Sequence, residues 1–176
     1  MKIECFPVLM SEEDALKRAR KGIAGLYGRN KKVTLRLMWL ENRYMEFEMT
    51  YQDTVLRKLL RKDKHQEDKQ KIRALVEATT CSGAYVPDPI KTVFREVDEN
   101  AIQATYYSDD RLIHTGRESV RRMVRRHVGR YITAELIEMR KVYRPYYIAI
   151  YGDMIEGTKA RYLPIPADGN SVERTF

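Results

Sequence analysis

Three side chains that can carry acid-base or metal chemistry stand close together in the sequence, at Asp109, Asp110 and His114. Two carboxylates and an imidazole around one turn could act as a general base or supply metal ligands. A metal site needs a further ligand, which the spacing does not supply, and Asp is also a common turn residue because its side chain bonds its own backbone. A small enzyme that uses these three residues is therefore the second interpretation. The first interpretation, a binding protein, follows from the charge of the chain.

Motifs of nucleotide-dependent enzymes are missing from the sequence. No Walker loop occurs, and no G-x-G-x-x-G follows a predicted strand. Gly22, Gly25 and Gly28 have the G-x-x-G spacing of KH loops, but they end a predicted helix that leads into a strand, whereas a KH loop leads into another helix. Cys81 could be a reactive thiol only with a base folded against it. We therefore expect no cofactor.

The strongest functional pattern is a set of arginines on a long predicted helix. Helical spacing places them opposite an apolar stripe that runs from Val120 to Met139, so their guanidinium groups gather along one side. Between residues 111 and 144, ten Lys and Arg face three Glu, which leaves +7 of the net +8 of the chain. The arginines of this side are Arg117, Arg121, Arg122, Arg125, Arg126 and Arg130.

Such a concentration of positive charge predicts an anionic partner. Like charges four residues apart repel each other on a helix, so the arginines call for counter-anions. Phosphates of RNA or DNA would supply them, and an acidic protein surface would serve as well. Alternatively, acidic side chains of the same chain could pair with these arginines, or the helix face could simply be solvated. The preferred interpretation is a non-catalytic binding protein, and the alternatives are the small enzyme and a subunit that docks in a larger assembly.

Length and composition indicate one soluble protein. The 176 residues, 43% of them hydrophobic and 33% charged, are typical of a single globular domain. The longest apolar runs, such as 37–40, fall far short of the roughly 20 residues that span a bilayer. Charge and Pro7 interrupt the amino terminus before a signal-type apolar core could form. Two cysteines without metal-site spacing fit a reducing cytoplasm.

Apolar periodicity predicts strands and helices in the first half of the chain. The expected elements are a strand over 2–6, a helix from Ser11 to Gly28, a hairpin over Val33–Tyr51 with its turn at 41–43, and a helix capped by Asp53 or Thr54 that resumes with the stripe Ile72, Leu75 and Val76. Residues 61–71 contain no apolar side chain, so they either continue this helix or form a loop.

The second half predicts a linker, a meander, a long helix and two strands. Glycine and proline mark residues 79–89 as the linker, where a split into two lobes is the alternative to one domain. The meander covers 92–97, 101–107 and 111–114. The long helix begins at the capping box of Thr115 and Glu118 and ends before Pro145. Two strands follow at 146–151 and 160–165.

These elements predict an α+β fold of antiparallel hairpins. They would form one or two small sheets packed with three or four helices, in a single domain over residues 1–176. Strands that follow one another in sequence argue against a doubly wound parallel sheet. A polar tail follows Pro166, and its contact with a second copy is the basis for a hypothetical homodimer. No membrane contact is expected.

Overall fold

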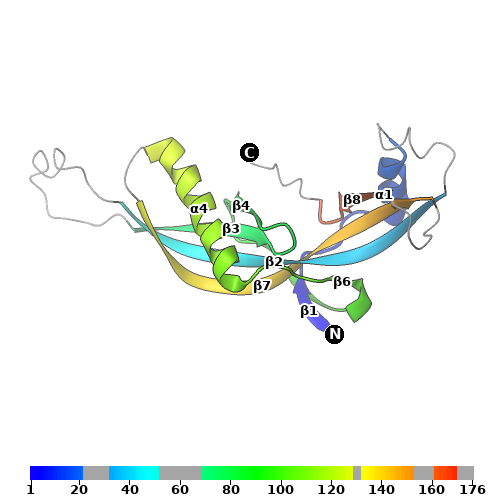
Figure 1. Cartoon of the computed structure of the whole chain (residues 1–176), viewed down its shortest axis with the longest axis horizontal. Helices are drawn as coiled ribbons and strands as arrows, with labels where there is room; N and C mark the ends of the chain where they lie inside the picture. Colours follow the sequence, from blue (N-terminus) through cyan, green and yellow to red (C-terminus); the bar gives the residue numbers. More distant parts are fainter. Residues whose placement is uncertain (22–31, 52–68, 129–131, 153–160, 170–176) are drawn as a thin grey trace, which may run out of the picture. The chain divides into compact units, whose positions relative to one another are not determined.

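The computed structural model describes residues 1–21, 32–51, 69–128, 132–152 and 161–169 (Figure 1). These ranges contain two α-helices and eight strands. In chain order the elements are β1 (Lys2–Cys5), α1 (Glu12–Ala19), β2 (Val33–Tyr51), β3 (Lys69–Glu77), β4 (Ser82–Val86), β5 (Val93–Glu96), the 3-10 turn η1 (Glu99–Ala101), β6 (Ile102–Gln103), α4 (Asp109–Val128), β7 (Ile132–Tyr151) and β8 (Arg161–Pro166). No helix in the described ranges is long and apolar enough to cross a membrane.

The prediction of small antiparallel sheets covered by three or four helices is wrong. The described strands form one eight-stranded sheet in the order β4-β3-β2-β7-β1-β5, with β6 also paired to β2 and β8 to β7. The sheet is mixed because β1 runs parallel to β7 and β6 runs parallel to β2, whereas β3, β4, β5 and β8 make antiparallel pairs. Segments expected to be helical contribute strands to it.

The predicted hairpin over residues 33–51 is a single continuous strand, β2. Its expected turn, Glu41-Asn42-Arg43, is buried. These polar side chains can lie inside a strand because tertiary partners satisfy them. The Tyr143 hydroxyl donates to Glu41 Oε2 at 3.1 Å, and Arg43 binds the carboxylate of Asp109 at 2.8 Å.

The segment expected to resume the second helix is strand β3. It pairs with β2 on one side and with β4 on the other, so Val76 lies opposite both Arg43 and Gly83. This pairing overrides the helical spacing of Ile72, Leu75 and Val76, because strand pairing satisfies the backbone on both sides. β4 also lies within the predicted linker. The expected helix after Asp53 or Thr54 lies outside the described residues, and so does most of 61–71.

The long helix begins earlier and ends earlier than predicted. α4 starts at Asp109, so residues 111–114 are helical and not a strand, and Thr115 and Glu118 lie inside the helix and do not cap it. Two acids in the first turn favour this start, since they complement the positive end of the helix dipole. The stripe beyond residue 132 belongs to β7. Of the predicted meander, β5 is confirmed, and β6 is parallel to β2.

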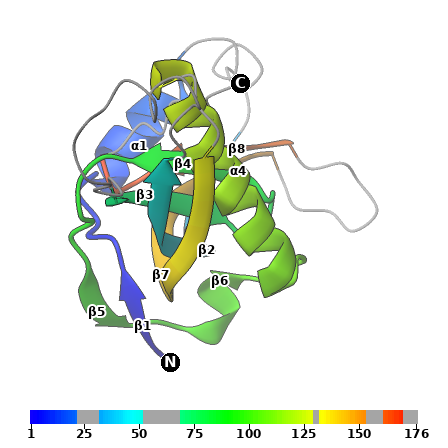
Figure 2. The ribbon, with the colours of Figure 1, turned by 90° about the vertical axis from the view of Figure 1, so that its left-hand side faces the viewer.

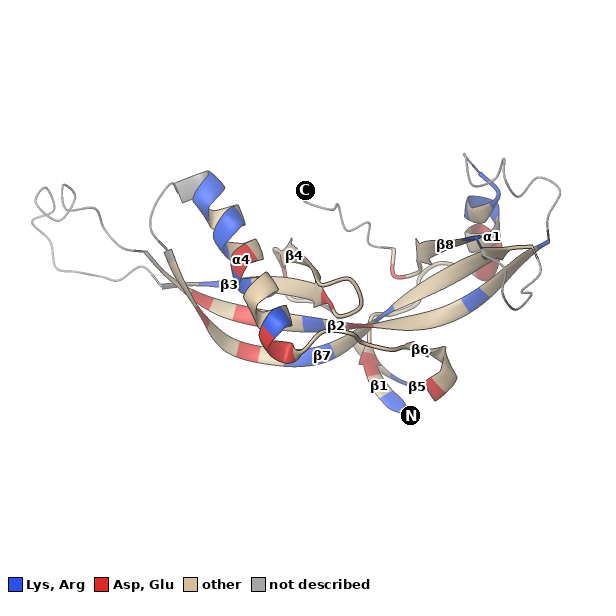
Figure 3. Ribbon diagram, in the orientation of Figure 1, with Lys and Arg blue, Asp and Glu red and all other residues tan. Residues whose placement is uncertain are grey.

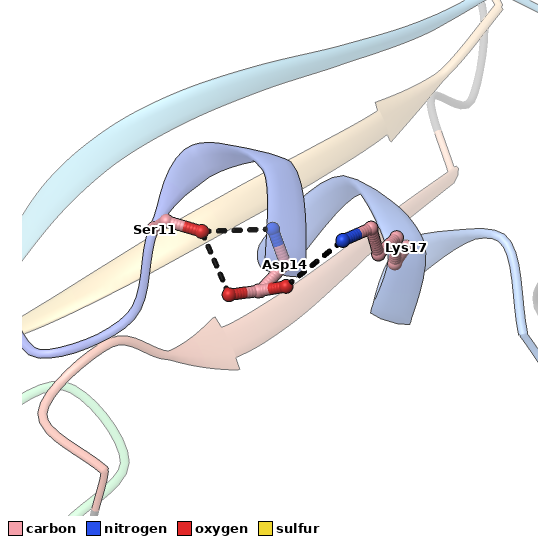
Figure 4. A network of polar contacts seen from close by, with 3 residues as sticks. All are labelled: Ser11, Asp14 and Lys17. Atoms are coloured by element: carbon pink, nitrogen blue, oxygen red, sulfur yellow. Dashed lines mark hydrogen bonds and ion pairs between the residues drawn. The ribbon is translucent and has the colours of Figure 1, made fainter.

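Three terminal elements confirm their predictions, except that α1 ends at Ala19 and not at the expected Gly28. β1 and β8 are strands, and α1 begins directly after the predicted cap residue Ser11. The Ser11 hydroxyl accepts the Asp14 backbone N–H at 3.1 Å and donates to the Asp14 carboxylate at 2.8 Å (Figure 4). These bonds, together with Lys17 at 3.3 Å, hold the pKa of Asp14 below its usual value. A correctly predicted cap thus fixes the start of the helix.

The chain forms two compact units, each made of separate segments. Unit 1 comprises Met1–Glu41, Lys91–Ala104 and Val142–Val172. Its buried cores hold Ile3, Cys5, Trp39 and Tyr143 in one cluster and Ala19, Ala149, Tyr151 and Ile165 in another. The buried Arg144 guanidinium donates two hydrogen bonds to the Asp168 carboxylate, at 2.8 and 3.0 Å. The prediction of a single domain, with a split near residues 80–90 as its alternative, stays a prediction.

Unit 2 comprises Asn42–Ile90, Thr105–Lys141 and Glu173–Phe176. In it α4 packs against the sheet beside β3 and β4 (Figure 2). Its core includes Met45, Phe47, Met49, Ile72, Ala74, Val76, Leu112, Val120 and Val124. Gly116 allows the helix to approach closely, because an added Cβ there would lie 2.7 Å from Met45 Sδ. The backbone of α4 at Gly116 therefore lies against the side chains of Met45 and Phe47 on β2.

Candidate anion-binding site on α4

The buried side of α4 determines which of its residues face solvent. Leu112, Gly116, Val120 and Val124 are buried and recur every four residues, so they form one stripe against the sheet. The opposite side of the helix must then be exposed. It carries Arg111, His114, Arg122, Arg125 and Arg126, all of them exposed.

The structure separates the six predicted arginines into three groups. Arg122, Arg125 and Arg126 are exposed, and none forms an ion pair with any described residue. Arg117 and Arg121 lie on the flank of the helix and are half-buried. Arg130 lies outside the described residues. We call Arg122, Arg125 and Arg126 the basic triplet.

The two flanking arginines have partners within unit 2. Arg117 Nε donates to the Ala134 carbonyl oxygen at 3.1 Å, which ties α4 to β7. Arg121 forms an ion pair with Glu118 at 3.0 Å, one helical turn earlier. These guanidinium groups therefore contribute to the structure of the unit. They leave the basic triplet as the accessible part of the predicted face.

The basic triplet has the spacing of neighbours on a helix surface. Residues three and four apart on a helix have Cβ atoms about 5–6 Å apart, so the three guanidinium groups can converge on one ligand. Figure 3 shows Lys and Arg over the carboxyl-terminal half of α4. Mutual repulsion costs about 0.2–0.5 kcal/mol per like pair, and the negative end of the helix dipole offsets part of that cost. An anion would neutralise the rest.

Arg111 is an exposed cation of α4 that sequence reasoning missed. The sequence predicted a strand at this position, which separated Arg111 from the helix arginines. Two aspartates followed by apolar residues with helical spacing, Leu112 and Gly116 among them, were the available indication of an earlier helix start. Arg111 belongs to the first turns of α4, with Asp109 and Asp110 beside it in sequence.

The predicted acid-base residues lie at the start of α4. Asp109 Oδ1 accepts hydrogen bonds from Arg43 at 2.9 and 2.8 Å, so this carboxylate already balances a cation. Asp110 and His114 are exposed and one helical turn apart. Across the described ranges, no group of three His, Cys, Asp or Glu side chains could hold a metal ion. The three residues are therefore not gathered into a metal centre.

Neither cysteine has a catalytic partner among the described residues. Cys81 has a positive φ of 54° in the turn between β3 and β4, and its Sγ lies 3.1 Å from the Thr115 hydroxyl, which is no base. Cys5 is buried in the core of unit 1, and burial raises its pKa. Burial in the core gives the Cys5 thiol the environment of a packing residue.

Comparison of the chain with protein-family models, with curated protein sequences and with solved structures finds no match. The chemistry of the candidate site therefore follows from its own residues. Those residues are three exposed arginines on one helix that form no ion pair with a described residue.

Proposed function

We propose that this protein is a non-catalytic binding protein that holds a nucleic acid by its phosphates against the basic triplet. The observation that supports this proposal is the exposure of Arg122, Arg125 and Arg126 on adjacent turns without an ion pair to a described residue. Asp109 is occupied by Arg43, so the geometry gives less support to the alternative enzyme.

Guanidinium groups suit phosphates in both charge and shape. Each presents a planar fork of N–H donors that can bind two phosphate oxygens at once. Binding to a polyphosphate backbone also releases condensed counterions, a gain that a small anion does not provide. Contacts of this kind position a nucleic acid without reading its bases. We therefore infer binding that is largely independent of nucleotide sequence.

The cellular location belongs to the same proposal. Cys5 and Cys81 are free thiols, one buried and the other half-buried. Free thiols persist in reducing compartments, where glutathione and thioredoxin keep cysteines reduced. We infer a cytoplasmic protein, in which RNA and DNA are abundant anionic partners.

Salt-dependent binding tests the proposal. Affinity for short RNA, single-stranded DNA and duplex DNA would be measured by fluorescence anisotropy at about 50 and 200 mM salt. Three phosphate contacts predict that duplex affinity falls about 40-fold between these concentrations. Replacing the triplet (Arg122→Gln, Arg125→Gln and Arg126→Gln) should weaken binding at least about tenfold and lower the salt slope by about one for each arginine that contacts a phosphate.

A matched control removes three other exposed cations. Arg18, Arg20 and Lys21, at and beyond the end of α1, are exposed, and changing all three to Gln alters the net charge equally. This control should keep most of the affinity. Equal losses in the two triple variants would show that net charge, not the triplet, causes binding. Binding to polyglutamate but to no nucleic acid would favour an acidic protein partner, and no salt-dependent binding at all would contradict the proposal.

A further inference from the structure

β5 is an edge strand of unit 1 with an exposed aromatic side chain. Among the described strands it ends the strand order of the sheet and pairs only with β1 (Figure 2). All four of its residues are exposed, Val93 by 46% and Phe94 by 71%. An edge of this kind offers unpaired backbone groups to another strand.

The pairing of β5 with β1 shows which backbone groups face outward. Met1 and Val97 exchange two hydrogen bonds, 2.9 Å from the Val97 N–H and 2.8 Å from the Met1 amino group. In an antiparallel pair, bonded and non-bonded positions alternate. The next bonded pair toward the strand interior is therefore Ile3 with Arg95. The N–H and C=O groups of Phe94 and Glu96 then point away from β1.

We propose that two copies of this chain associate through β5, antiparallel, with Phe94 opposite Phe94 of the second copy. The two outward-facing residues make this arrangement self-complementary. Phe94 would exchange both hydrogen bonds with its symmetry mate, and Glu96 would pair with Thr92 of the second copy. A two-fold interface uses the same surface on both subunits, which a single edge strand can provide. The sheet would continue from one copy into the other.

Side-chain pairing selects this register over its neighbour. The hydrogen-bonding pattern also allows a shift that sets Phe94 opposite Glu96, but this shift places Arg95 opposite Arg95. Like charges directly opposite are destabilising, whereas an aromatic pair contributes about 0.2–1 kcal/mol. With Phe94 opposite Phe94, the remaining cross-strand pair is Val93 with Arg95. No like charges then meet across the seam.

The surroundings of Phe94 fit an aromatic pair. The Lys2 ammonium lies 5.3 Å from the centroid of the Phe94 ring, and Lys2 is the cross-strand partner of Glu96. The register therefore sets one cation opposite one carboxylate on this side of the strand, and the Phe94 ring is its exposed apolar group. A single short strand buries little area, so we expect a weak dimer with a Kd between about 1 µM and 1 mM.

Sedimentation equilibrium over about 1 µM to 1 mM protein should show a monomer to dimer transition. Phe94→Ala should raise the dimer Kd several-fold. Glu96→Pro should abolish the dimer, because proline removes an N–H that points outward and leaves the bonds to β1 intact. Tyr106→Ala is the matched control, since Tyr106 is a 73% exposed aromatic residue in unit 2. A monomer at every concentration would overturn the proposal and leave the edge for another protein.

Cysteine cross-linking tests the register. Directly bonded antiparallel residues have Cα atoms about 5.5 Å apart, within reach of a disulfide. Phe94→Cys should therefore form a disulfide-linked dimer on mild oxidation, whereas Arg95→Cys and Tyr106→Cys should stay at the level of the parent chain. Preferential cross-linking of Arg95→Cys would overturn the proposed register. Circular dichroism of each variant would show that it is folded. Hydrogen exchange of the Phe94 amide completes the test, because protection of that amide in the monomer would show that the edge is already covered.

Discussion

Two charged surfaces of unit 2 differ in how their charges are matched. On the sheet, the Glu46 carboxylate binds Lys71 at 3.0 Å and Arg73 at 3.1 Å, and its side chain is only 12% exposed. The hydrogen bond from Lys71 is the main reason that the pKa of Glu46 lies below its usual value. On α4, the basic triplet forms no ion pair with a described residue, and Glu118, four residues before Arg122, pairs with Arg121.

The difference follows from the geometry of the two elements. Strand register places Glu46 directly opposite Arg73, and Glu48 opposite Lys71, so opposite charges meet across β2 and β3. On α4, positions three and four apart within the triplet all carry the same charge. Charges on the sheet therefore stabilise the fold. Charges of the triplet contribute little to it and are available to a partner.

The largest expected effect comes from separating α4 from the sheet that supports it. Gly116→Val should lower the free energy of unfolding by about 2–3 kcal/mol, because its Cβ would meet Met45 Sδ at 2.7 Å and Phe47 Cζ at 3.3 Å. Urea denaturation would measure the loss. His114→Val, an exposed change on the same helix, should show only the small cost of a β-branched residue. Equal losses in both variants would contradict the close approach at Gly116.

Removing the acid of the paired surface should have an intermediate effect. Glu46→Gln should lower the free energy of unfolding by about 1 kcal/mol near pH 7. Since the folded pKa of Glu46 lies below its usual 4.5, its contribution is present above that pH and is lost as pH falls through the folded pKa. Denaturation near pH 3 should therefore show a smaller difference between variant and parent. Glu135→Gln, an exposed change on β7 that removes the same charge, is the matched control.

The smallest effect on stability should come from the unpaired surface. Changing Arg122, Arg125 and Arg126 together to Gln should alter the free energy of unfolding by less than about 0.5 kcal/mol, because relieved repulsion and lost dipole interaction offset each other. Thermal and urea denaturation would measure this change beside the binding assay. A loss above about 1 kcal/mol would show that these arginines support the fold.

Local rules predicted the elements that are stabilised locally. Ser11 and Asp14, which lie three residues apart, fix the start of α1. The sequence alone was therefore sufficient to predict that start. β2 was different, because Glu41, Asn42 and Arg43 resemble a turn in isolation. The inward-facing apolar residues from Val33 to Met49 have odd numbers both before and after these three residues. This unbroken alternation was the available indication of one strand. Their partners, Tyr143 and Asp109, come from distant parts of the chain.

The candidate site was predicted in part. Arg122, Arg125 and Arg126 lie exposed on a helix, as their spacing indicates, whereas the half-burial of Arg117 and Arg121 depends on β7. The sequence predicted that this helix continues past residue 132, where β7 begins. A stripe that fits both helical and strand spacing cannot reveal this change, because pairing with β2 and β8 decides it.

Two of the boundaries between the units fall inside single strands. One lies between Glu41 and Asn42 of β2 and another between Lys141 and Val142 of β7. No contiguous fragment of the gene therefore encodes either unit, and a cut at any of these boundaries would leave both incomplete. Recombination therefore cannot transfer either unit to another protein as one continuous gene segment. The two units have to be inherited, expressed and engineered as one piece.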